Sequence, residues 1–512
     1  MLSKIKSCVL HGIDGFMIDV EVDISQGLPV FDIVGLPDSA VKESRERVKT
    51  AITNSGFTFP VKRITVNLAP ADIKKEGALF DLPIAAGILA CIGAISQDSL
   101  ENTLIAGELS LDGKIRGING VLPMVYSSCQ KGINKFIVPL ENQEEAALIE
   151  NAEVFGVDSL KQFIAHLNGT EPVLPCHLDA SAIFEKARSS LGYLDFADVK
   201  GQEAVKRAME IAAAGMHNIL LIGPPGTGKT MLAKRLPSIL PDLTFEESIE
   251  ITKIYSVAGL LGNGDSLVVS RPVRSPHHSI SSSALTGGGR IPKPGEISLA
   301  HNGVLFLDEL PEFQRNVLEV MRQPMEDKKV TIARVGGTVT YPSSFMLVAA
   351  MNPCPCGYLG DPKRCHCSPG EISKYTGKIS GPLLDRIDIQ VETPAVDYAK
   401  LSDTASGESS EEIKKRVLKA HKTQLERFKN DGIFFNSQLS AKLTEKYCVL
   451  DTAGQALIKA AFSRLGLSAR AYHKILRVAR TIADIEGSEN ITTKHIAEVI
   501  GYRSLDRKYF YN

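Results

Sequence analysis

The sequence predicts a multidomain α/β protein, with an N-terminal α+β domain, a central phosphate-binding core built on a parallel sheet, and a helical C-terminal region. Three observations support this prediction. The 512 residues are too many for one hydrophobic core and fit about three domains. A glycine-rich loop lies between a short apolar strand and a helix at 219–236. Two more apolar strands, 303–307 and 345–351, end in polar residues.

The composition excludes some classes of protein. The net charge is −1, so any contact with nucleic acid must come from local basic patches. The most apolar stretch, Leu79 to Ile95, is interrupted by Asp81 and Pro83 and falls short of a membrane span. The first residues lack the apolar core of a signal peptide, so we expect a cytoplasmic protein without a membrane partner. Five of the nine cysteines are isolated, which does not indicate a disulfide framework.

Residues 1–169 alternate short strand-like runs with helices, as expected of an α+β domain. Met17 to Ile24 alternates with period two, Ile64 to Leu68 is a second strand, and Val41 to Asn54 has helical spacing. Leu104 to Ile115 is predicted as two strands joined at Asp112-Gly113. No catalytic or binding site is evident in this domain.

One part of this domain resembles a known enzyme. Ala106 to Gly120 is similar to the proteolytic domain of Lon-type proteases, which implies a ribosomal-protein-S5-like fold. In that family a nucleophilic Ser follows a Lys-Asp-Gly-Pro run, and a Lys lies just after the glycine that Gly120 matches. Here Leu79 follows Lys75-Glu76-Gly77-Ala78, and Met124 stands where the Lys would fall. Because Leu and Met cannot supply a nucleophile and its base, we interpret the domain as a scaffold or binding domain.

Residues 170–192 are polar and mixed, contain Pro172 and Pro175, and are predicted to be a linker. The core then extends over 193–396. Its first helix has apolar positions at intervals of three and four, and leads directly into the strand Ile219 to Ile222.

The glycine-rich loop after that strand has the sequence and context of a P-loop. Its glycines allow backbone N–H groups to converge on an anion, and the following helix adds its positive N-terminal end. Lys229 is expected to reach the β and γ phosphates, and the Thr230 hydroxyl to bind Mg²⁺. The expected nucleotide ligands are Gly223, Pro224, Pro225, Gly226, Thr227, Gly228, Lys229 and Thr230.

The apolar strand 303–307 ends in Asp308 and Glu309. Acids at the C-terminal end of a central parallel strand lie in the crevice where ligands bind. We therefore expect Asp308 to hold Mg²⁺ and Glu309 to activate the attacking water.

A long segment with little periodicity, which runs to Ala300, gathers basic residues beside Gly287-Gly288-Gly289. Each residue alone is explained as part of a solvated loop, but together they favour a functional insertion. His277 and His278 alone do not indicate a metal. The residues are Arg271, Arg274, His277, His278, Arg290 and Lys293.

Two β-branched runs, 328–335 and 338–341, surround Gly336-Gly337 and predict a hairpin. Lys328, Lys329 and Arg334 would make it positive enough to touch a phosphate backbone, although a purely structural hairpin remains an alternative.

Asn352 ends the apolar strand that begins at Phe345, so it is expected beside the γ-phosphate. Directly after it, Cys354, Cys356, Cys365 and Cys367 form the spacing C-x-C-x8-C-x-C. Four soft ligands in one loop are enough for a tetrahedral Zn²⁺ site, whereas C-x-C is less usual than C-x-x-C in such sites. Reduced thiols in a surface loop are therefore the alternative.

Residues 397–512 become polar and then helical, and are predicted to form a lid. Arg470 lies near the start of a helix whose apolar face includes Ile475, Val478 and Ile482. Arg386 stands between carboxylates, where a surface ion pair would be its plainest role.

With these parts in order, the chain from about Phe196 resembles a AAA+ ATPase of the magnesium-chelatase-like group. The whole chain is similar to the bacterial ComM/YifB family. The resemblance implies a helix-2 insert before Asp308, a pre-sensor-1 hairpin at 328–341, sensor 1 at Asn352 and sensor 2 at Arg470. It implies that Arg386 is an arginine finger acting on a neighbouring subunit, and thus that the subunits form a ring, most often a hexamer.

The resemblance further implies ATP and Mg²⁺ as cofactors and DNA as the track of a branch-migration motor in recombination or natural transformation. The expected DNA contacts are Lys328, Lys329, Arg334, Arg274, His277 and His278. A protein-remodelling or metal-insertion motor with a protein client remains an alternative, as does a binding protein in which ATP only switches assembly.

Overall fold

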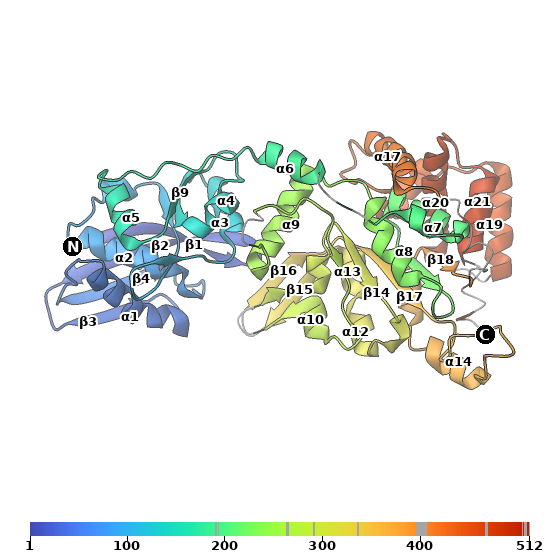
Figure 1. The fold of residues 1–512 in the computed structure, drawn as a ribbon, viewed down its shortest axis with the longest axis horizontal. Helices are drawn as coiled ribbons and strands as arrows, with labels where there is room; N and C mark the ends of the chain where they lie inside the picture. Colours follow the sequence, from blue (N-terminus) through green and yellow to red (C-terminus); the bar gives the residue numbers. More distant parts are fainter. Residues whose placement is uncertain are drawn as a thin grey trace. The chain divides into compact units, whose positions relative to one another are not determined.

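The computed structural model describes residues 1–189, 192, 194–262, 266–289, 292–334, 337–395, 407–465, 469–503, 505, 509 and 510. The chain divides into two compact units (Figure 1). Unit 1 comprises Met1–Ser190 and Thr244–Val269, and unit 2 comprises Leu191–Leu243 and Ser270–Asn512. Among the described residues, no helix combines the length and apolar character needed to cross a membrane.

Unit 1 is built on a seven-stranded sheet of order β3-β4-β2-β1-β5-β8-β9. The long β1 and β2 pair antiparallel, and α1 (Ser39–Asn54) and α2 (Asp81–Cys91) contact each other. Every residue of α2 is buried, which explains why Leu79 to Ile95 is so apolar. The strands are β1 (Leu2–His11), β2 (Asp14–Ser25), β3 (Val30–Val34), β4 (Arg63–Ala69), β5 (Thr103–Ile105), β8 (Lys135–Pro139) and β9 (Glu153–Val157).

The elements expected at 17–24, 41–54 and 64–68 are confirmed as β2, α1 and β4. The expected hairpin at 104–115 is shorter than predicted. Only β6 (Glu108–Leu109) and β7 (Ile115–Arg116) pair, because residues 104–105 belong to β5 of the main sheet. Leu79 packs against a hydrophobic cluster that contains Met124, so both positions contribute apolar packing.

The range predicted to be a linker contains a helix, α6 (Ala180–Ser189). Its Phe184 is buried and meets Phe245 edge to face, with ring centroids 6.0 Å apart. Its proline-containing start had suggested a linker, but the helical residues that follow it pack on another part of unit 1. Leu191 and Tyr193 lie outside the described residues.

Helix α9 (Phe245–Ala258) follows the P-loop helix in sequence, yet it belongs to unit 1. It contacts α3 (Val121–Cys129), and Ser256 donates a hydrogen bond to the buried carboxylate of Glu145. Glu145 also accepts from the backbone N–H of Leu122 at 2.9 Å. The expected core range 193–396 therefore differs from the compact units, because it includes a helix that packs elsewhere. The reason is tertiary packing, which helical periodicity does not reveal.

Unit 2 contains a five-stranded sheet of order β11-β14-β17-β10-β18, in which all neighbours are parallel. The three central strands are fully buried, as expected of a parallel sheet covered on both faces. Helix α7 (Glu203–Gly215) precedes β10 and α8 (Lys229–Arg235) follows it. The strands are β10 (Ile219–Ile222), β11 (Val273–Arg274), β14 (Val304–Leu307), β17 (Met346–Met351) and β18 (Ile389–Glu392).

The basic segment before Asp308 is more regular than its sequence suggested. It contains α10 (Ser282–Thr286), a two-stranded ribbon of β12 (Gly287–Gly288) and β13 (Lys293–Pro294), and α11 (Glu296–Leu299). Such short elements leave no periodicity to detect. Arg290 lies outside the described residues.

The hairpin predicted at 328–341 is confirmed as the antiparallel pair β15 (Lys329–Arg334) and β16 (Gly337–Pro342). Val335 and Gly336, at its expected tip, lie outside the described residues. Tyr341 is buried and its hydroxyl donates to the carbonyl of Pro292 at 2.7 Å, which ties the hairpin to the ribbon segment.

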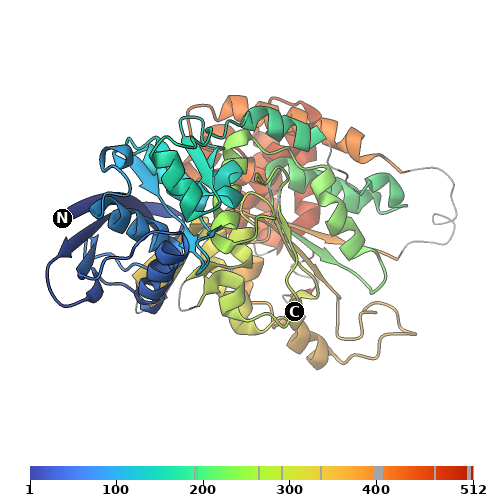
Figure 2. The same cartoon turned by 60° about the vertical axis from the view of Figure 1, so that its left-hand side comes forward.

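The C-terminal helices lie together beside α7, orange to red in Figure 1 and Figure 2. They share one hydrophobic cluster with the sheet, which includes Val205 of α7, Ile389 of β18 and Ile475. The helical C-terminal region is thus confirmed, and it packs as part of unit 2. Its helices are α17 (Ser410–Arg427), α18 (Ala441–Tyr447), α19 (Thr452–Leu465), α20 (Ala469–Glu486) and α21 (Thr493–Arg503).

Candidate nucleotide site

The glycine-rich loop joins β10 to α8 at the C-terminal end of the parallel sheet. Gly226 and Gly228 have φ of 78° and 83°, a region that L side chains rarely adopt. At Gly223, a Cβ atom would lie 2.1 Å from the hydroxyl oxygen of Thr393, so the close approach of the strand ends requires glycine there. These glycines shape the loop for backbone N–H groups to converge on an anion.

Lys229 lies at the first residue of α8 and reaches back along the loop. Its Nζ donates to the carbonyls of Gly223 at 2.7 Å and Pro224 at 2.8 Å, and to Oδ1 of Asn352 at 3.2 Å. Burial lowers the pKa of Lys229, while the Asp308 and Glu309 carboxylates oppose that shift. The ammonium group of Lys229 thus lies within the loop beside Asn352, where it can form a charge-assisted hydrogen bond with a phosphate.

Asp308 and Glu309 follow β14 directly. One carboxylate oxygen of Asp308 accepts from the Thr230 hydroxyl at 2.6 Å, and the other accepts from the Glu309 backbone N–H at 3.0 Å. Glu309 has φ of 51° and its side chain is 55% exposed, so its carboxylate faces open space. Hydroxyl and carboxylate oxygens are the donors that Mg²⁺ prefers, so Thr230 and Asp308 fit this ion.

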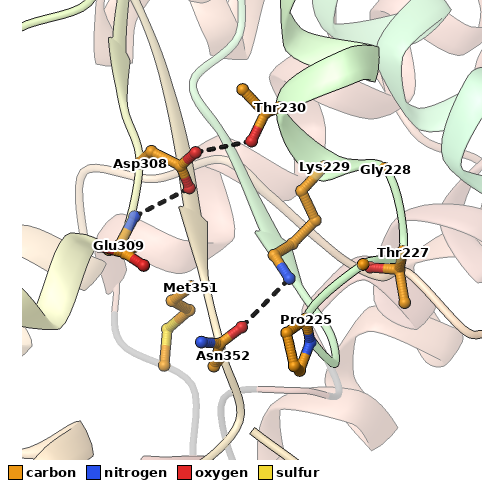
Figure 3. Close-up of a pocket in the computed structure, with 10 residues that line it drawn as sticks. Pro225, Thr227, Gly228, Lys229, Thr230, Asp308, Glu309, Met351 and Asn352 are labelled. Carbon is orange, nitrogen blue, oxygen red and sulfur yellow. Dashed lines mark hydrogen bonds between the residues drawn. The ribbon is translucent and has the colours of Figure 1, made fainter.

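These side chains meet in one cavity of about 380 Å³. Figure 3 shows Lys229 pointing to Asn352, and Asp308 between Thr230 and Glu309. Of the predicted nucleotide ligands, Gly223 and Pro224 are not among the lining residues and instead hold Lys229. The lining residues are Pro225, Gly226, Thr227, Gly228, Lys229, Thr230, Asp308, Glu309, Met351 and Asn352.

Sequence reasoning missed the place of His278. It was expected to contact DNA, but its Nδ1 lies 3.6 Å from Oε2 of Glu309. Its ring also packs on that of His277, with centroids 4.0 Å apart, and on Phe313. His277 itself bonds Ser279 at 2.8 Å. The sequence around His278 does not indicate this contact, because only the folded chain places His278 beside the end of β14.

Arg274 was also expected to contact DNA. Its guanidinium forms two hydrogen bonds with the carboxylate of Glu296, at 2.6 and 2.8 Å. A bidentate pair of this kind holds β11 to α11 and engages the Nε and Nη2 edge of the guanidinium. The structure therefore gives Arg274 a bracing contact within the insert.

Arg386 and Arg470 lie together, away from the P-loop cavity. Nη2 of Arg386 is 2.5 Å from Oε1 of Glu326, and Nη2 of Arg470 is 3.9 Å from the same oxygen. Arg386 lines a second cavity of about 460 Å³ with Glu326, Thr331 and other residues. Among the described residues, the lining of the P-loop cavity includes neither arginine.

The basic residues of the hairpin lie at its base and along β15. Lys328, with φ of 56°, caps α13 (Arg322–Asp327), and both Lys328 and Lys329 are exposed. The backbone of Arg334 pairs with Gly337, but its side chain lies outside the described part of the structure. Burial of the ammonium group lowers the pKa of Lys328, with Asp388 opposing that shift, so the exposed Lys329 is the lysine available to a partner.

The four clustered cysteines lie in the loop that joins β17 to α14 (Pro369–Thr376). Their sulfur atoms all lie within 4.8 Å of one another. The loop also touches the P-loop, since a Cβ atom at Gly357 would lie 2.6 Å from Cδ of Pro225.

The P-loop follows β10, Asn352 follows the neighbouring strand β17, and the acidic pair follows β14 on the other side of β17. Together with the C-terminal helical region, this arrangement defines a AAA+ nucleotide-binding core. Comparisons with known proteins agree. Residues 195–401 match the family described as magnesium chelatase, subunit ChlI, and residues 407–503 match its C-terminal family. Residues 20–142 match the family described as subunit ChlI of Mg-chelatase.

Several relatives match along almost the whole chain. The competence protein ComM of Haemophilus influenzae is 44% identical over 99% of this chain and 98% of that protein. The YifB protein of Salmonella typhimurium is 46% identical over 97% of this chain and 96% of its own. The magnesium-chelatase 38 kDa subunit of Chlorobaculum parvum is 23% identical over 60% of this chain and 88% of that subunit. The chain therefore belongs to the ComM/YifB family of magnesium-chelatase-like AAA+ proteins.

Proposed function

We propose that the chain is one subunit of a ring-shaped motor that hydrolyses ATP between neighbouring subunits and acts on DNA. One observation carries this proposal: the P-loop cavity holds the phosphate-binding and acidic residues, whereas Arg386 lines a separate cavity and shares the carboxylate of Glu326 with Arg470. Phosphoryl transfer needs cationic groups around the γ-phosphate to stabilise its developing charge. A second subunit would supply them if its Arg386 faced the P-loop of the first.

Within one subunit, the residues divide the work by position. Lys229 would leave its carbonyl acceptors for the β and γ phosphates, which bind an ammonium group more strongly than neutral carbonyls do. A Mg²⁺ ion held by Thr230 and Asp308 would neutralise part of the phosphate charge. Glu309 would accept a proton from the attacking water, and Asn352, already bonded to Lys229, would orient that water.

Arg386 must exchange one partner for another in this scheme. It pairs with Glu326 at 2.5 Å and its side chain is 10% exposed. In a ring, a neighbour's γ-phosphate would compete with Glu326 for the guanidinium, and Arg470 on the same side would follow it. A ring of identical subunits closes when each P-loop meets the next subunit's arginines, most often as a hexamer in such ATPases.

DNA is proposed as the track for two reasons. The relative from Haemophilus influenzae is named a competence protein, and Lys329 lies exposed at the base of a hairpin. Because the net charge is −1, such contacts would be local, and affinity would fall steeply with salt. Branch migration of recombining DNA is the activity we propose. A protein client is the second candidate, favoured by the similarity to a magnesium-chelatase subunit.

Unit 1 is proposed to be a Lon-like domain without peptidase activity. Leu79 and Met124 pack in the same hydrophobic region, where the related proteases carry their catalytic groups. It would then serve as a scaffold or bind a partner.

The test is steady-state ATP hydrolysis by the purified chain, alone and with single-stranded, duplex or four-way-junction DNA. Glu309→Gln serves as control, since it should bind ATP and turn it over at least about a hundredfold more slowly. Stimulation by DNA that fades with rising salt supports the proposal. Equal activity with every form of DNA contradicts DNA as the track and favours a protein client.

A further inference from the structure

The loop between β17 and α14 brings four thiols together. The sulfur of Cys354 lies 3.4 Å from that of Cys356 and 3.9 Å from that of Cys365. Cys367 supplies the fourth sulfur, and all four sulfur atoms lie within 4.8 Å of one another. None of the four is in a disulfide. The two C-x-C pairs, 354/356 and 365/367, are separated in the sequence, so their close approach requires a physical explanation.

The separations fit one tetrahedral ion. Zinc–sulfur bonds of about 2.3 Å in a tetrahedron place the sulfurs about 3.8 Å apart. The observed contacts of 3.4 and 3.9 Å lie on either side of that value. Four thiolates without other donors are typical of structural zinc.

The backbone around the cysteines is arranged for thiolates. The backbone N–H groups of Gly357, Tyr358 and Cys356 lie near the sulfurs of Cys354, Cys356 and Cys367, respectively, where they favour the thiolate form. N–H groups placed in this way offset part of the excess negative charge of four thiolates around one divalent ion. Lys363 and Arg364, both exposed on the same loop, add compensating positive charge.

We propose that Cys354, Cys356, Cys365 and Cys367 bind one zinc ion, which fixes the loop between β17 and α14. The site goes beyond the proposed function and does not depend on it.

The position of the loop gives this ion a structural purpose. Asn352 stands two residues before Cys354, and Gly357 packs on Pro225 of the P-loop. From the far end, the hydroxyl of Tyr375 of α14 lies near the backbone N–H of Asn352. A loop of this length without strands or helices would otherwise be free to drift, so the ion would hold both of its ends against the nucleotide site.

The first test is the metal content of the full chain, purified without chelator and measured by mass spectrometry for zinc and iron. We expect about one zinc per chain. Cys365→Ser should lower the zinc content about tenfold, because three thiolates bind far more weakly than four. Cys129→Ser, a cysteine in unit 1, should leave it unchanged. Less than a tenth of a zinc per chain, or iron in its place, overturns the proposal.

The second test measures the loop itself and needs no ATP. Hydrogen exchange of residues 353–376 should become about tenfold faster after zinc removal and return to its starting rate when zinc is restored. Co²⁺ in place of zinc should give the intense visible absorption of a tetrahedral thiolate site. Exchange that is identical with and without bound zinc would contradict the role of the ion in fixing the loop.

Discussion

Lys229 and Asn352 follow two neighbouring strands, β10 and β17, and their side chains form a hydrogen bond of 3.2 Å. The position of each residue follows from local structure, because Lys229 begins helix α8 and Asn352 directly follows the buried strand β17. The parallel sheet then brings both to one edge, beside Asp308 and Glu309. ATP hydrolysis at this site would depend on a few side chains at the strand ends, so single substitutions should change it.

His278 is predicted to position Glu309. Its Nδ1 lies 3.6 Å from the exposed carboxylate, which otherwise has open space around it. His278→Ala should lower kcat for ATP several-fold and leave KM unchanged, because a carboxylate that is less well placed activates water poorly. His277→Ala is the matched control, since His277 bonds Ser279 instead. Equal loss in both variants would show only a structural role for the histidine pair.

His217 makes stability depend on pH. It is fully buried against Thr481, and burial lowers the pKa of His217 from 6.5 to about 4, with nearby Arg477 and Lys474 acting in the same direction and Asp388 against it. Between these two values the unfolded chain binds a proton that the folded chain does not, so stability falls as pH is lowered through that window.

From about pH 7 to about pH 5, His217 should account for a loss of about 2 kcal/mol in the free energy of unfolding. Urea unfolding followed by circular dichroism measures this loss, and His217→Gln should reduce it by that amount. His177→Gln, at an exposed position in unit 1, should not change it. A variant at 217 with the same pH dependence as the parent would contradict this account.

At the scale of elements, the contact between the cysteine loop and the P-loop can be tested without touching a thiol. A Cβ atom at Gly357 would lie 2.6 Å from Cδ of Pro225, whereas at Gly360 nothing lies within 4 Å. Both glycines have positive φ, 86° and 95°. Alanine at either position therefore costs about 1 kcal/mol of backbone strain.

Only Gly357→Ala should also displace the P-loop. We expect it to weaken ATP binding about tenfold, and Gly360→Ala to leave it within about twofold. Titration with a fluorescent ATP analogue measures both. Equal affinities in the two variants would mean that the loop does not support the P-loop.

The elements that the sequence predicted well are those with a strong local signal. The apolar strands β10, β14 and β17, the P-loop and the hairpin β15–β16 each carry their pattern in fewer than about fifteen residues. The contacts of His278 with Glu309 and of Arg470 with Glu326 join residues far apart in the chain. No local pattern encodes them, because they arise only when the sheet and the C-terminal helices have packed.

At the scale of the molecule, the chain passes between the two units three times, near 190, 243 and 269. The last two crossings enclose α9, whose Ile249, Ile251 and Ile254 are buried. By its position in the sequence, α9 falls in the predicted core range 193–396. In the structure it contacts α3 and belongs to unit 1. Domain limits drawn from the sequence alone therefore cut through a compact unit.

This division predicts how fragments behave. Residues 193–512 alone should aggregate, because α9 would expose apolar surface worth roughly 2 kcal/mol for each buried isoleucine. The same fragment with 244–269 replaced by a glycine-serine linker of about eight residues should remain soluble. Gel filtration compares the two. Equal solubility of both fragments would contradict the assignment of α9 to unit 1.

The central claim is that the ATP site is complete only between two subunits. Lys229→Ala and Arg386→Ala would remove opposite halves of one interface, so each variant alone should be inactive. Mixed before assembly in equal amounts, they should regain about a quarter of the parent ATPase activity, since about one interface in four pairs an intact P-loop with an intact arginine. Lys229→Ala mixed with Glu309→Gln lacks this complementarity and should stay inactive. No recovery in the first mixture, with joint assembly verified by a tag on one variant, would contradict the claim.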